Sequence, residues 1–128
     1  MELQSRRKGH TLLLTICEER FDTELASEFV EIIKGWRREG VAQIVLDLHR
    51  VNFLDSTSLG VLVSCFKSIR EKSRGEGGLS LCHVSNRIMS LLKLTRMDRV
   101  LPVYDSCEEA LQALEKESQD ADGGGDLT

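Results

Sequence analysis

Residues 45–60 read VLDLHRVNFLDSTSLG, and this stretch decides the fold. It continues the apolar run Val41–Leu48, which predicts a buried strand in a sheet that helices cover. A loop over residues 49–55 follows, and it leads into Asp55-Ser56-Thr57-Ser58. Small carboxyl and hydroxyl side chains are favoured at a helix start because their oxygens accept hydrogen bonds from the free backbone N–H groups. The stretch therefore predicts a strand, a loop and the beginning of a helix.

Helices and strands alternate on both sides of this stretch. Short apolar runs predict strands at residues 11–17, 41–48, 79–84 and 100–104. Residues 2–8 form a further candidate strand, joined to residues 11–17 by a hairpin turn at Gly9-His10. Apolar residues at spacings of three and four predict helices that follow Asp22, Asp55, Ser85 and either Asp105 or Ser106. This alternation predicts an α/β fold, namely a mixed, mostly parallel sheet with an N-terminal hairpin and four helices.

The length and composition are those of one globular domain. The chain has 128 residues, of which 41% are hydrophobic and 30% are charged, and this is enough to form a core. We expect the domain to span residues 1–117. Residues 118–128 include the sequence DADGGGDLT and lack apolar periodicity, which predicts a disordered, acidic and glycine-rich tail.

The charge balance and the apolar runs exclude several classes of function. A net charge of −4, from 17 basic and 21 acidic residues, argues against nucleic-acid binding, which needs a concentrated basic face. No apolar run reaches the roughly 18 residues of a membrane span, so no membrane association is expected. No signal peptide is recognisable at the N-terminus, so we expect a cytoplasmic protein.

The cysteines and histidines do not form a recognisable ligand set. The four cysteines (Cys17, Cys65, Cys82 and Cys107) contain no C-x-x-C pair, and the three histidines are equally scattered. We therefore expect reduced thiols, no zinc site, no disulfide framework and no cofactor. Asp47 and Asp55 stand at opposite ends of a loop with no nucleophile, histidine or metal set to join them, so we do not expect an enzyme.

The helix start at Asp55 has a chemistry of its own. Free N–H groups and the helix dipole favour an anion there, so a phosphate on a hydroxyl would be accommodated. Such a phosphate changes the surface charge by about −1.5 to −2, which suits a binding switch. The alternative is that these residues are only a helix cap, and physical reasoning on the residues alone leaves both interpretations open.

The same residues resemble a known family. The apolar strand at 44–48, the segment Val51-Asn52-Phe53-Leu54 and the run Asp55–Gly60 together resemble the signature of the anti-sigma factor antagonist family, the bacterial STAS domain. Residues 79–82 followed by 88–95 resemble the fourth strand and third helix of that family. The resemblance covers roughly residues 2–114 and implies the STAS fold.

The resemblance also implies functional roles. Ser56 matches the serine that an anti-sigma factor serine kinase phosphorylates, and Asp55 matches the acidic residue beside it. Asp22 matches an aspartate at the start of the first helix that helps to form the partner surface. The unphosphorylated antagonist binds the kinase and frees the sigma factor, phosphorylation releases it, and a metal-dependent Ser/Thr phosphatase restores it. The partner-binding residues so implied are Asp22, Asp55, Ser56, Thr57, Ser58, Leu59 and Gly60.

Two departures from the family pattern lie beside this site. Ser58 stands where the family has glycine, so its side chain narrows the approach of a partner and offers a second hydroxyl acceptor. Residues 19–22 replace the glycine-containing element that precedes the first helix. The alternative function is a non-switching STAS scaffold or assembly module, either stressosome-like or a transport accessory, and a weak homodimer stays open.

Overall fold

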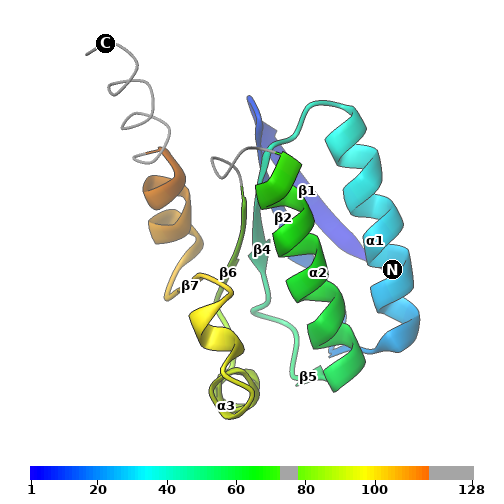
Figure 1. The fold of residues 1–128 in the computed structure, drawn as a ribbon, viewed down its shortest axis with the longest axis vertical. Coiled ribbons are helices and arrows are strands. Elements are labelled where there is room, and N and C mark those ends of the chain that lie inside the picture. Colours follow the sequence, from blue (N-terminus) through cyan, green and yellow to red (C-terminus); the bar gives the residue numbers. More distant parts are fainter. Residues whose placement is uncertain (73–77, 116–128) are drawn as a thin grey trace.

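The computed structural model describes residues 1–72 and 78–115 (Figure 1). A five-stranded sheet runs in the order β1-β2-β4-β6-β7, in which β1 and β2 are antiparallel and the remaining neighbours are parallel. Its strands are β1 (Leu3–Lys8), β2 (Thr11–Ile16), β4 (Gln43–Asp47), β6 (Gly78–Cys82) and β7 (Val103–Tyr104). The predicted mixed, mostly parallel sheet with an N-terminal hairpin is confirmed.

The helices lie on both faces of the sheet. Figure 1 shows α1 and α2 together on one side, and the last helix, drawn in orange, on the other. The helices are α1 (Thr23–Arg38), α2 (Ser56–Lys72) and α3 (Asn86–Leu94), followed by the 3-10 turn η1 (Met97–Arg99) and the last helix at residues 107–115. The predicted end of that helix near Glu117 and the predicted acidic tail fall outside the described residues.

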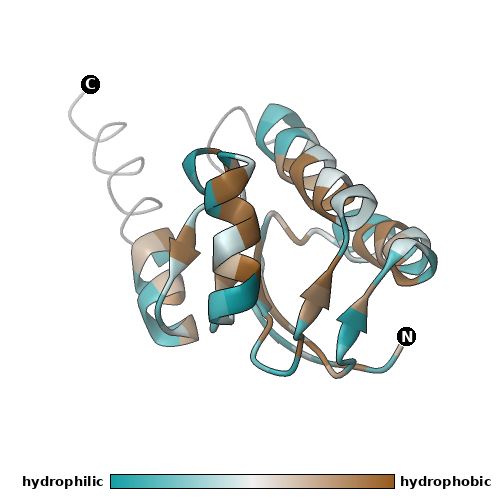
Figure 2. Ribbon diagram, turned by 90° about the horizontal axis from the view of Figure 1, so that it is seen from below, coloured by the Kyte–Doolittle hydropathy of each residue, from teal (hydrophilic) through white to brown (hydrophobic). Residues whose placement is uncertain are grey.

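Strand side chains alternate between two hydrophobic clusters. Ile44 and Leu46 of β4 point into the main core, where they meet Phe29 of α1 and Leu62 of α2. Val45 points to the opposite face and packs with Ala110 and Leu114 of the last helix. Figure 2 shows hydrophobic and hydrophilic stretches alternating along the helices, as expected of helices that cover a sheet.

A second, two-stranded sheet was not predicted. Strand β3 (Arg20–Phe21) pairs in parallel with β5 (Phe53–Leu54), and the backbone N–H of Asn52 donates to the carbonyl of Glu19 at 2.8 Å. The guanidinium of Arg20 lies 4.0 Å from the centre of the Phe53 ring, which is a cation–π contact. This small sheet joins the segments that lead into α1 and α2.

The last strand is shorter than predicted. We expected a strand over residues 100–104, but β7 begins at Val103, because residues 100–102 form the turn and bend that follow η1. The carbonyl of Pro102 still accepts a hydrogen bond from Leu81 at 2.9 Å, whereas the proline has no N–H to donate. At the other edge, β1 exposes nearly all of its residues, Arg6, Arg7 and Lys8 among them.

Among the residues that the structure describes, none belongs to a helix that is long and apolar enough to cross a membrane.

Candidate functional site

The N-terminus of α2 is capped by Asp55. The backbone N–H of Ser58 donates to Oδ1 of Asp55 at 2.8 Å, and that of Leu59 donates to the Asp55 carbonyl at 3.0 Å. Ser56 and Thr57 are exposed in the first turn that follows this cap. The predicted helix start is confirmed, and the hydroxyl of Ser56 is accessible at the positive end of the helix dipole.

The N-terminus of α1 lies beside this helix start. Asp22 caps α1, since its Oδ1 accepts a hydrogen bond from the backbone N–H of Leu25 at 3.2 Å. The hydroxyl of Thr23 then donates to Oδ2 of Asp55 at 3.3 Å, so one carboxylate links the two helices. The pairing of β3 with β5 fixes this arrangement from the other side. The structure therefore brings Asp22, Asp55 and Ser56 into one region, as the resemblance implied.

Hydrogen bonding keeps the Asp55 carboxyl ionised. The Ser58 side chain and then the Ser58 backbone N–H, followed by Thr23, hold the pKa of Asp55 below its usual value, and desolvation opposes them. Of the two Ser58 groups, only the backbone N–H forms a hydrogen bond of ordinary geometry with the carboxylate, while Oγ lies near it without one. Asp55 therefore presents a negative charge beside Ser56 at neutral pH. A negative cap also complements the helix dipole, which stabilises the first turn of α2.

Two of the residues that the resemblance implied as partner contacts lie in the interior. Ser58 is fully buried and Leu59 is 4% exposed, so neither can touch a docked protein in this conformation. The expectation that Ser58 offers a second accessible hydroxyl is therefore wrong. Its Oγ finds no hydrogen-bond partner among residues 1–72 and 78–115. The helix turns Ser58 inward because it lies four residues before the core residue Leu62.

An open groove runs from this helix start between α1 and α2. It has a volume of about 450 Å³, and Thr57, Gly60 and Ser64 of α2 form one wall. Gly60 is exposed, and a Cβ added there would meet no atom within 4 Å. Lys34 and Arg37 of α1 contribute positive charge to the other wall. The exposed residues Thr57 and Gly60 thus belong to a continuous surface that includes Ser56.

A second hollow adjoins the site on the side of α3. It has a volume of about 300 Å³ and lies between β5 and α3, with Phe53, Arg87 and Leu91 among its lining residues. Leu94 also lines it and is 84% exposed, which is unusual for a large apolar side chain. Exposed apolar surface next to a polar site is typical of a protein–protein interface.

The cysteines differ from the expectation. Cys82 and Cys107 are joined by a disulfide, with 5.2 Å between their Cα atoms, so the prediction of four reduced thiols is wrong. Cys82 ends β6 and Cys107 begins the last helix, and only the long-range fold brings them together. Cys17 and Cys65 are free. Burial raises the pKa of the Cys65 thiol, partly offset by Arg37 and Lys34, so the nucleophilic thiolate form is disfavoured.

Comparisons with known proteins agree with the fold. The sequence matches the STAS domain family over residues 2–110. It is 28% identical over 120 residues to the anti-sigma F factor antagonist of Paenibacillus polymyxa, a match that covers 90% of this chain and 97% of that protein. The structure of the anti-sigma factor antagonist SpoIIAA in its unphosphorylated form superposes with a TM-score of 0.73 at 14% identity, covering 90% of this chain and 97% of that one.

The phosphorylated form of the Bacillus cell fate determinant SpoIIAA is also similar. It superposes with a TM-score of 0.65 at 15% identity, and the match covers 88% of this chain and 99% of that one. At these levels of identity, the likeness of the structures establishes a shared fold.

Proposed function

Because this chain belongs to the STAS domain family, we propose that it is an anti-sigma factor antagonist switched by reversible phosphorylation of Ser56. The observation that carries the proposal is the exposed Ser56 hydroxyl, held on a capped helix start beside the start of α1. The anti-sigma F factor antagonist of Paenibacillus polymyxa supports the general role. The proposed partner is an anti-sigma factor serine kinase, and the protein would meet it in the cytoplasm.

The contact surface is formed by exposed or half-exposed residues around the two helix starts. These residues are Asp22, Asp55, Ser56, Thr57 and Gly60. Because Gly60 has no side chain, the backbone of a partner can approach α2 closely at this position. The hollow beside Leu94 extends this surface with apolar area, and such area supplies most of the free energy of association.

Phosphorylation would change the surface and leave the fold intact. A phosphate on Ser56 adds a charge of about −1.5 to −2 next to the ionised carboxylate of Asp55. The N-terminus of α2 tolerates this charge, because free N–H groups and the helix dipole stabilise anions there. A docked partner must instead desolvate the phosphate and accept its bulk, so binding weakens. A Ser/Thr phosphatase then restores the binding form.

The first experiment is a phosphosite map of the protein isolated from its native cells during growth and under stress. The proposal predicts a mixture of unmodified and singly phosphorylated chains, with the phosphate on Ser56. A chain that stays unmodified in every condition contradicts the switch and favours the scaffold function. Size-exclusion chromatography with light scattering then identifies a self-associating assembly module.

Binding measurements with charge variants test the mechanism. Ser56→Asp is expected to weaken binding to the purified anti-sigma factor kinases of the source organism at least tenfold, whereas Ser56→Ala retains binding and accepts no phosphate. Ser5→Asp is a matched control, since Ser5 is exposed on β1 and receives the same charge in another element. Equal weakening by Ser5→Asp and Ser56→Asp would show that net charge matters and the proposed site does not.

A further inference from the structure

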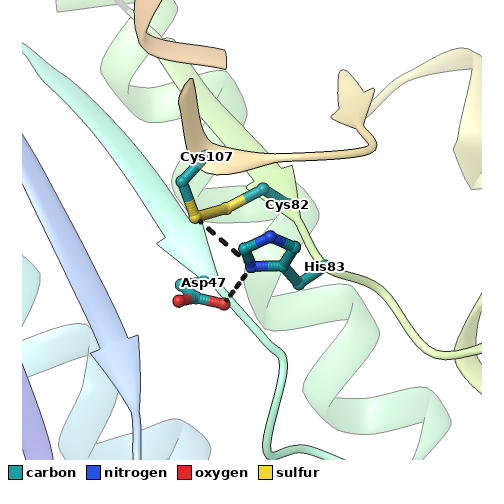
Figure 3. Close-up of side chains that lie close together, drawn as sticks. All are labelled: Asp47, Cys82, His83 and Cys107. Atoms are coloured by element: carbon teal, nitrogen blue, oxygen red, sulfur yellow. Dashed lines mark hydrogen bonds and ion pairs between the residues drawn. A yellow bond between two sulfur atoms is a disulfide. The ribbon is translucent and has the colours of Figure 1, made fainter. Parts of the chain in front are cut away.

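A cluster of four potential metal ligands lies at the carboxyl ends of the central strands (Figure 3). Asp47 ends β4 and Cys82 ends β6, and the two residues are register partners in the parallel sheet. Their side chains therefore leave the sheet on the same face. His83 follows Cys82 directly, and Cys107 reaches the cluster from the first turn of the last helix.

The distances within the cluster are those of a tetrahedral metal site. Nδ1 of His83 lies 3.1 Å from Oδ1 of Asp47 and 3.6 Å from Sγ of Cys107, and all four ligand atoms lie within 4.8 Å of one another. Tetrahedral Zn²⁺ with ordinary bond lengths separates a nitrogen and an oxygen ligand by about 3.4 Å, and a nitrogen and a sulfur ligand by about 3.6 Å. The two sulfurs, which are bonded to each other here, must separate to about 3.8 Å, and the remaining pairs of ligand atoms start within 4.8 Å of one another.

Further contacts hold these ligands in place. Asp47 is largely buried, and its Oδ2 lies 3.1 Å from Nδ1 of His49 and 3.4 Å from the hydroxyl of Thr15, which donates to it. The backbone N–H of His49 donates to Oδ1 at 3.0 Å. Such outer contacts orient the ligands of metal sites. From the sequence we expected no histidine or metal set that joins Asp47 to Asp55, and the structure places His49 and His83 against Asp47.

The backbone of His83 has the conformation that the cluster needs. Its φ angle is 55°, in the left-handed region that residues other than glycine seldom occupy. This conformation ends the extended path of β6 and leaves the imidazole between Asp47 and Cys107, as Figure 3 shows. A conformation of this kind persists where the surrounding structure requires it, and it is commonest at functional sites.

We propose that the protein, when its disulfide is reduced, binds one Zn²⁺ through Cys82 Sγ, Cys107 Sγ, His83 Nδ1 and Asp47 Oδ1. Two thiolates and an imidazole are the donors that select zinc over hard cations. Reduction of the disulfide yields two thiols and takes two electrons from the reductant. Two molecules of a thiol reductant also supply the two protons and are joined in a disulfide, whereas with a phosphine the protons come from water, whose oxygen is transferred to form the phosphine oxide. Zn²⁺ binding then releases the two thiol protons, so the disulfide and the metal are alternative links between the same two cysteines.

The metal would cross-link three elements of the reduced protein. Asp47 belongs to β4, Cys82 to β6 and Cys107 to the last helix. A ligand that binds only the folded state stabilises it by mass action. Zinc is therefore expected to raise the unfolding temperature of the reduced protein and to hold the last helix on the sheet.

The test uses the full chain, reduced with a phosphine, stripped of metal with a chelator and titrated anaerobically with Co²⁺. The proposal predicts one Co²⁺ per chain, with the visible bands of tetrahedral Co²⁺ and near-ultraviolet sulfur-to-cobalt charge transfer. Zn²⁺ added afterwards abolishes both signals. Cys107→Ser and His83→Gln weaken Co²⁺ binding at least tenfold, whereas the control Cys65→Ser, at another free cysteine, binds like the unmodified protein.

The oxidised protein is a second control that does not depend on any substitution. Its disulfide removes both thiolates from the described fold, so it is expected to show no charge-transfer band. The proposal is overturned if the reduced chain takes up no Co²⁺, if the bands appear equally in the oxidised chain, or if Cys107→Ser binds as tightly as Cys65→Ser.

Discussion

Replacing Ser58 by alanine is expected to stabilise the protein. The Ser58 hydroxyl is fully buried and has no hydrogen-bond partner within the described part of the chain. Folding therefore removes it from water without a replacement, which costs about 1–3 kcal/mol. Alanine keeps the Cβ that fills this space and is also the better helix former, by up to about 0.5 kcal/mol. The free energy of unfolding should rise by about 1–3 kcal/mol.

Two companion variants separate the contributions to this gain. Ser58→Gly introduces the residue of the family pattern and removes the same hydroxyl, but glycine inside a helix costs about 1 kcal/mol relative to alanine. Its gain should therefore be about 1 kcal/mol smaller than that of Ser58→Ala. Ser64→Ala changes an exposed serine of the same helix, and it is expected to gain at most about 0.5 kcal/mol from helix propensity.

Urea unfolding followed by tryptophan fluorescence measures these differences, since Trp36 is the single tryptophan. With a denaturant dependence of about 2 kcal/mol per molar urea, a gain of about 2 kcal/mol moves the midpoint by about 1 M. All variants are compared in the same redox state. A midpoint for Ser58→Ala at or below that of the unmodified protein would refute the reasoning, because the hydroxyl would then have a partner in solution.

Three further variants test the site and the core. Asp55→Asn should make the stability of the protein less sensitive to acid. Because the pKa of Asp55 is lowered in the folded state, its carboxylate contributes stability that is complete above the ordinary pKa of 3.8 and is lost as the pH falls through the folded-state pKa. The urea midpoint should therefore fall less in the variant than in the unmodified protein between about pH 5 and pH 3. Gly60→Ala should raise the free energy of unfolding by about 0.5–1 kcal/mol in thermal melts, because alanine is the better helix former and the added methyl group meets open space. The same substitution should weaken kinase binding, and unchanged binding would remove Gly60 from the proposed surface. Phe29→Ala should cost about 3–5 kcal/mol by urea unfolding, since this ring is fully buried, and a loss below about 1 kcal/mol would mean that the core is not packed as described.

The large elements of the fold could be predicted because their signals are local. The periodicity of Phe29 and Ile33 identified α1, and the apolar run before Asp47 identified β4. The capping residue Asp55 allowed the start of α2 to be predicted for a similar reason, since a cap and the helix that it begins are neighbours in the sequence. Local signals of this kind do not depend on how the rest of the chain folds.

The features that were missed depend on contacts between distant parts of the chain. Strands β3 and β5 have two residues each, too short for an alternating pattern, and only their mutual pairing defines them. Cys82 and Cys107 are 25 residues apart, and their proximity depends on where the last helix docks. The burial of Ser58 did have a local signal, because its spacing of four from Leu62 places it on the apolar side of α2.

The two edges of the main sheet restrict how copies of this protein can associate. An open edge with free N–H and C=O groups invites another strand, and long apolar edges lead to aggregation. Here β1 presents Arg6, Arg7 and Lys8 at one edge, so a second copy would bring like charges together. The other edge, β7, offers only two residues for pairing. Continuous sheets between copies are therefore disfavoured, and any homodimer would form through helical surfaces, where it would compete with the proposed partner.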